Sequence, residues 1–194
     1  MMKKIAASML FSCIIVLLFT SCSLGGSMFN RAFGNKGSLG KTSHGDQAYA
    51  NAQMDKVLEA IKNRDSDALK SMFSKKALGQ EELDQSIIDL FDFFQGDFIS
   101  YDDWSAINVE EGLNDDGTGR RWKALYSTYD VETNKQKYRI AIQDFILDTA
   151  DSNNVGISSF YIIKFENDTD PNIAYRGDDK YTPGINFNIK NVLL

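Results

Sequence analysis

One carboxylate in the chain lies where a general base would be expected. Asp144 shares one face of an alternating segment with Ile140, Ile142 and Ile146. A carboxylate among isoleucine side chains loses hydration, which raises its pKa towards the range that proton transfer requires. The residues leave open two other interpretations, a place near a strand edge or an ion pair with one of three arginines: Arg120, Arg121 or Arg139.

Aromatic side chains form a second group of candidate site residues. Such side chains commonly line ligand pockets, so five of them are candidate pocket walls: Trp104, Trp122, Tyr126, Tyr138 and Tyr161. The alternative is that they pack in the core or on the surface of a sheet.

Several classes of site are excluded by composition. His44 is the only histidine, and Cys13 and Cys22 are the only cysteines, all before residue 46. A Ser-His-Asp triad, a Cys-His pair and a zinc site of such ligands are therefore excluded from the rest of the chain. We expect neither a metal nor a cofactor, and the net charge of −6 argues against nucleic acid as a partner.

The first 22 residues have the layout of a secretory signal peptide. Lys3 and Lys4 precede an apolar run over residues 5–19, and two small residues then lead to Cys22. We expect removal of residues 1–21, which takes the net charge to −8. The alternatives are an uncut membrane-spanning helix and cleavage before Cys13.

The rest of the chain divides into a linker and one domain. Residues 22–45 begin with Cys22 and continue rich in Gly, Ser, Asn and Lys, which predicts a flexible tether. Residues 46–194 are long enough for one domain with its own core.

Within this domain, helical periodicity comes first. Met54, Val57, Leu58 and Ile61 form an apolar stripe that predicts a helix over residues 46–63. A short second helix follows an N-cap at Asp65 or Ser66. The spacing of five apolar residues predicts a third helix that ends at Gly96: Leu83, Ile87, Leu90, Phe91 and Phe94.

After Gly96 the apolar period changes to two, as in β-strands. We expect strands over residues 98–109, 120–131, 138–147 and 155–166, joined by polar turns into an antiparallel meander. The tail from Asn167 ends in four spaced apolar residues and is expected to add an edge strand or to pack across the sheet: Ile185, Phe187, Ile189 and Val192. Helices followed by a curved antiparallel sheet predict an α+β fold.

Two resemblances add to this interpretation. Thr20-Ser21-Cys22 resembles the lipobox of bacterial lipoproteins, with Phe19 where Leu is usual. This implies an acylated Cys22, palmitate being one such group, and a protein anchored at the extracytoplasmic face of the membrane. The run from Asn63 to Ser74, with Asp97-Phe98-Ile99-Ser100-Tyr101, resembles the cystatin-like cone of the nuclear transport factor and ketosteroid isomerase superfamily.

That second resemblance implies a cavity between helices and sheet but no single activity. Tyr181-Thr182-Pro183-Gly184-Ile185 is similar to the closing segment of small lipoproteins of this fold from Gram-positive bacteria. We expect a non-enzymatic domain that binds a small apolar ligand or a protein. The alternatives are an enzyme that uses Asp144 with a tyrosine, and a structural or regulatory lipoprotein that acts as a homodimer.

Overall fold

The computed structural model describes residues 44–103, 107–113, 119–168 and 181–187, which all belong to one compact unit, residues 38–194. The expected signal peptide, Cys22 and most of the linker lie outside these ranges. No helix within them is both long and apolar enough to cross a membrane.

Four helices open the described part of the chain: α3 (His44–Asn63), α4 (Ser66–Met72), α5 (Lys75–Leu78) and α6 (Leu83–Phe93). The Asp65 carboxylate accepts a hydrogen bond from the Ala68 N–H and so caps α4, which decides between the two predicted N-cap residues. The three predicted helices are confirmed. α5 was not predicted; it is a single turn that Ser74 caps by accepting a hydrogen bond from the Ala77 N–H.

A six-stranded sheet follows the helices. Its strands are β1 (Phe98–Asp103), β2 (Asn108–Leu113), β3 (Arg121–Thr133), β4 (Lys137–Asp148), β5 (Gly156–Lys164) and β6 (Gly184–Phe187). The order is β1-β3-β4-β5-β6, and β2 also pairs with β3. The pairs are antiparallel except β5 and β6, which run parallel. The tail therefore adds an edge strand at Ile185 and Phe187, whereas Ile189 and Val192 lie outside the described residues.

The prediction of one strand over residues 98–109 is wrong. β1 pairs with the second half of β3, from Tyr129 to Thr133, whereas β2 pairs with the first half, from Arg121 to Tyr126. Two short strands in succession thus share one long neighbour. Alternating hydrophobicity cannot separate this arrangement from one continuous strand, because both keep a period of two.

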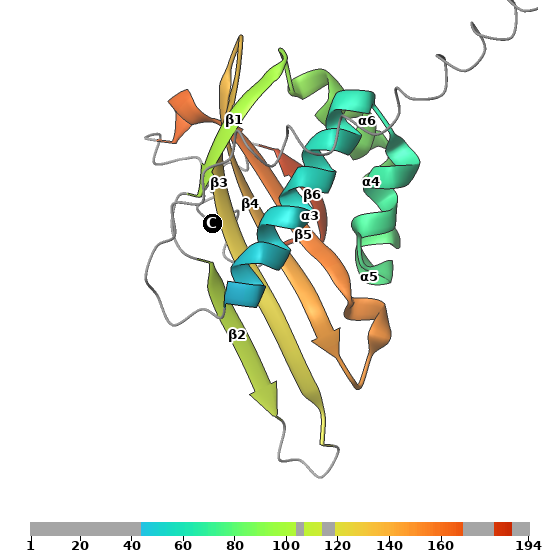
Figure 1. Ribbon diagram of the computed structural model, residues 1–194. Helices are drawn as coiled ribbons and strands as arrows, with labels where there is room; N and C mark the ends of the chain where they lie inside the picture. Colours follow the sequence, from blue (N-terminus) through green and yellow to red (C-terminus); the bar gives the residue numbers. More distant parts are fainter. Residues whose placement is uncertain (1–43, 104–106, 114–118, 169–180, 188–194) are drawn as a thin grey trace, which may run out of the picture. The chain divides into compact units, whose positions relative to one another are not determined.

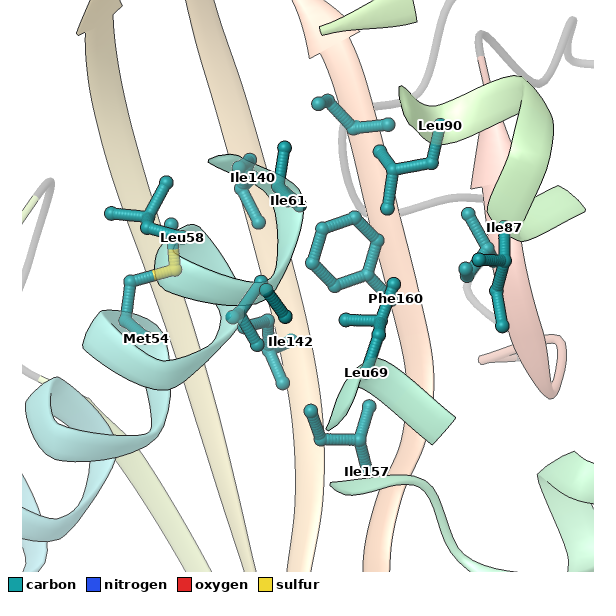
Figure 2. Packing of buried hydrophobic residues seen from close by; sticks show 14 of the residues in the cluster. Met54, Leu58, Ile61, Leu69, Ile87, Leu90, Ile140, Ile142, Ile157 and Phe160 are labelled. Atoms are coloured by element: carbon teal, nitrogen blue, oxygen red, sulfur yellow. The ribbon is translucent and has the colours of Figure 1, made fainter. Parts of the chain in front are cut away.

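The helices lie on one face of the sheet (Figure 1), which confirms a mixed helix-and-sheet architecture. The apolar stripe of α3 meets side chains from α4, α6 and the central strands. Figure 2 shows Met54, Leu58 and Ile61 of α3 near Ile140 and Ile142 of β4, with Phe160 of β5 beside Leu69 of α4. All of these side chains are buried in one cluster.

The backbones of the helical layer and of β5 touch directly at Gly156. The Ser74 N–H donates to the Ile157 carbonyl at 2.9 Å. Gly156 has a φ of +117°, and a Cβ at this position would lie 2.8 Å from the Ser74 nitrogen. Glycine is therefore required here, both for its backbone conformation and for the close approach.

Candidate functional site

The face of the sheet turned away from the helices, here called the outer face, carries a row of polar side chains. Asn108 of β2 pairs with Tyr126 of β3, Tyr126 with Gln143 of β4, and Gln143 with Ser159 of β5. Successive side chains of a strand point to opposite faces. The row therefore lies on the face opposite Leu125, the buried neighbour of Tyr126 along β3.

This row forms one wall of a cavity of about 60 Å³. Three tyrosines line it, Tyr126, Tyr161 and Tyr181, and no lining residue among those described is charged. A cavity of this size has room for about four water molecules. The remaining lining residues are small, polar or aliphatic: Asn108, Ser127, Thr128, Ala141, Ile142, Gln143 and Ser159.

A chain of hydrogen bonds fixes the polar groups of the cavity. The Ser159 hydroxyl donates to the Gln143 side-chain oxygen at 3.3 Å, and the Gln143 amide nitrogen donates to the Tyr126 hydroxyl at 3.0 Å. The Tyr126 hydroxyl in turn donates to the Glu110 carboxylate of β2 at 3.0 Å. Burial and this acceptor raise the pKa of Tyr126 to about 12, so the phenol is neutral near pH 7.

Tyr181 closes the cavity from the segment before β6. Its ring lies 5.1 Å from the ring of Tyr126, with 60° between the two planes. Tyr181 has a φ of +52°, which is uncommon for a residue with a side chain. The Asn186 side-chain amide donates to the Thr182 and Gly184 carbonyls and so holds this segment in place.

A buried arginine lies on the same outer face, next to the cavity. Arg139 is bound by Asp130, with Nε to Oδ1 at 2.8 Å, and by Asp168. Its guanidinium also lies 4.9 Å from the ring centre of Phe165. Burial alone would lower the pKa of Arg139, but the two carboxylates outweigh this effect and the pKa is raised. The positive charge is thus compensated locally and is not directed into the cavity.

Asp144 lies on the opposite face of the sheet, beneath α3. It pairs with Leu125 and Ile157 on the neighbouring strands and is only 4% exposed. Neither of its carboxylate oxygens has a hydrogen-bond partner among the described residues. This burial raises the pKa of Asp144 to about 7, against the opposing effect of Lys56.

The arginine pairings considered for Asp144 are not formed. Arg120 binds Asp148 instead, and Arg139 binds Asp130 and Asp168. Asp144 instead affects Tyr49 of α3. The pKa of Tyr49 is raised mainly by burial, and the charge of Asp144 raises it further. Asp144 is absent from the described lining of the outer-face cavity, so that cavity does not join it to a tyrosine.

The other predicted pocket residues separate in the structure. Tyr126 and Tyr161 line the cavity together, and Trp122 lies instead against Gly112 and the ring of Phe145. Tyr138 is absent from the described lining of this cavity. Its ring is fully buried in the core, where its hydroxyl donates to the Phe93 carbonyl at 2.9 Å and accepts from the Gln95 N–H at 2.7 Å. Trp104 lies outside the described residues.

Sequence reasoning missed Gln143, Ser159 and Tyr181. Because side chains alternate along a strand, the sequence alone places Gln143 on the face opposite Asp144. Only the register between strands, however, shows that Gln143 meets Tyr126 and Ser159.

Comparison with known proteins places the domain in a family without assigning it an activity. The family model described as a domain of unknown function, DUF5104, matches residues 56–165, which is more than half of the chain. None of the curated proteins matches the chain.

Proposed function

We propose that this chain, which belongs to the DUF5104 family of domains of unknown function, is a ligand-binding domain held at the extracytoplasmic face of a membrane by a lipid on Cys22. The observation that carries the binding function is the outer-face cavity, with its tyrosine walls and its prearranged chain of hydrogen bonds. Pockets that combine aromatic walls with a few oriented polar groups are typical of small-molecule sites.

The proposed superfamily is the cystatin-like cone named above. Its support is the succession of helices and long antiparallel strands, with all four helices on one face of the sheet (Figure 1). This cone is a scaffold for many functions, so the binding proposal rests on the cavity and not on the fold.

The lipid anchor has its own test. We expect the wild-type protein to fractionate with membranes and to incorporate labelled palmitate, and Cys22→Ala to lose the label. Two acyl chains are enough for stable anchoring, whereas a cleaved chain without them is released. If the wild-type protein fractionates with membranes but incorporates no palmitate, the anchor is the uncut apolar helix.

Ligand binding can be tested by NMR with a library of small uncharged and charged fragments. We expect amide shifts to cluster at Tyr126, Gln143, Ser159 and Tyr161, and binding to weaken when Tyr161 is replaced by leucine. Tyr49→Leu is the matched control, because Tyr49 is a tyrosine of α3, outside the described lining. Shifts confined to other surfaces, or a complete lack of binding, would overturn the proposal and favour a protein partner or a second copy of the chain.

Asp144 supports a second candidate function, proton transfer on a small apolar substrate. The supporting observation is a buried carboxylate without a hydrogen-bond partner among the described residues and with a pKa near that of a working general base. The protein should then catalyse exchange of hydrogens next to the carbonyl of small ketones in D₂O, and Asp144→Asn should abolish it. If wild type and variant leave the ketone signals equally unchanged, this function is rejected for those substrates.

A further inference from the structure

We infer that the outer-face cavity is an aromatic cage for a small organic cation that carries a methylated ammonium group. This inference rests on the proposed function of the cavity in ligand binding. It goes further by naming the chemical class of the ligand.

Three tyrosine rings line the cavity. Tyr126 and Tyr161 stand on β3 and β5, and Tyr181 approaches from the segment before β6. The planes of Tyr126 and Tyr181 meet at 60° with ring centres 5.1 Å apart, so the two rings form a corner. Several aromatic rings around one small space are the arrangement that attracts a methylated ammonium, because its spread positive charge meets the negative faces of the rings.

Polar side chains of the cavity wall form hydrogen bonds with one another. Ser159, Gln143 and Tyr126 form one continuous chain that ends at the Glu110 carboxylate. A ligand rich in hydroxyl groups would have to compete with these bonds, because it gains most from polar groups that are still open. A quaternary ammonium has no N–H to donate and needs no such group.

The charges around the cavity also favour a cation. Its described lining holds no lysine or arginine, so an anion finds no counter-charge there. The neighbouring Arg139 is occupied by Asp130 and Asp168. Glu110, at the end of the hydrogen-bond chain, places a carboxylate 3.0 Å from the Tyr126 hydroxyl. It draws on the Tyr126 proton and makes that ring more electron-rich, which favours a cation.

The experiment compares two probes of the same shape in the wild-type protein. Choline carries the trimethylammonium group, and 3,3-dimethyl-1-butanol replaces its nitrogen by carbon and is neutral. The full-length protein, labelled with ¹⁵N, is held in a maltoside detergent that has no ammonium group of its own. We expect choline to shift the amides of the outer-face row and to bind about tenfold more tightly than the neutral isostere.

Variants then assign the binding to the rings. Tyr181→Leu should weaken choline about tenfold or more, whereas Tyr126→Phe, which keeps the ring, should change it by about threefold at most. Glu110→Gln should weaken choline and leave the isostere unchanged. Tyr49→Leu is the control outside the cavity and should leave both probes unchanged.

Three other outcomes would overturn the proposed aromatic cage. If the isostere binds as tightly as choline at the outer face, the cavity selects shape and not charge, so the cage is rejected while the binding function stands. If choline binds but Tyr181→Leu has no effect, the cation lies elsewhere and the cage is again rejected. If neither these probes nor any fragment shifts the outer-face amides, both the cage and the proposed function fail. The probe comparison needs no variant, so a failure of Tyr181→Leu to fold would not prevent this decision.

Discussion

Replacing Asp144 by asparagine should make the protein more stable at neutral pH. The Asp144 carboxyl is 4% exposed and has no hydrogen-bond partner among the described residues, so its charged form has lost water without compensation. Its pKa is raised from 3.8 to about 7. Asparagine keeps the shape and cannot ionise.

The magnitude follows from linkage. An acid with a raised pKa in the folded state binds its proton more tightly there than in the unfolded chain, so folding stability falls as pH rises from 3.8 towards 7. Ionisation of the buried carboxyl lowers the free energy of unfolding by about 4 kcal/mol above pH 7, and about 2 kcal/mol of this loss is already present at pH 5. The free energy of unfolding that Asp144→Asn gains over the wild type should therefore be about 2 to 3 kcal/mol larger at pH 8 than at pH 5.

Urea unfolding followed by circular dichroism at pH 5, 6, 7 and 8 measures this difference. Glu81→Gln is the matched control, because it removes one acidic charge from an exposed position and should leave the pH dependence unchanged. Lys56→Gln should move the midpoint of the wild-type pH dependence upward, since Lys56 lowers the pKa of Asp144. If Asp144→Asn differs from wild type by the same free energy at pH 5 and pH 8, the carboxyl ionises as freely in the folded protein as in the unfolded chain, and the reasoning is refuted.

Three further predictions concern stability. The pKa of Asp148 is lowered mainly by Arg120, so the ionised carboxylate stabilises the fold above its ordinary pKa and this stabilisation is lost as pH falls. Asp148→Asn should therefore lower the free energy of unfolding by about 3 kcal/mol at pH 7. In an acid titration, the variant should lose less further stability below pH 4 than the wild type. Gly156→Ala should lower the free energy of unfolding by about 3 kcal/mol, because the added Cβ would press on the Ser74 backbone. Gly119→Ala should lower it by about 1 kcal/mol, because Gly119 has a φ of +61° but no atom within 4 Å of the added Cβ. Equal thermal shifts for the two variants would contradict this prediction. Leu90→Ala should cost about 3 kcal/mol in urea unfolding, and a comparable loss for Leu78→Ala, which is 41% exposed, would be inconsistent with the core described above.

The helices could be predicted closely because their signals are local. The α3 stripe repeats every three or four residues, and Asp65 precedes an apolar run as an N-cap. The break between β1 and β2 could not be predicted, because it depends on which half of β3 each strand meets. The single turn of α5 is too short to show a period.

The candidate site was only partly predictable, for a related reason. Alternation along β4 places Asp144 with Ile140 and Ile142, and the structure buries it beneath α3 on the helix-facing side. The outer-face cavity instead needs residues from distant strands in register, and Tyr181 joins them from beyond the sheet's main strands. Tyr138 and Tyr161 both lie in predicted strands, yet one is in the core and the other lines the cavity.

The parallel pairing of β6 has a consequence for how the chain is made. Ser159 of β5 pairs with Gly184, and Phe187 packs edge-on against Phe93 of α6, so the last described strand contacts a helix nearly a hundred residues earlier. Contacts of such sequence separation form late, because a long loop must close first. Translation that stops short of residue 184 would leave β5 with open backbone groups along its edge, a template for pairing with other chains. A truncated product is therefore expected to aggregate before it can fold.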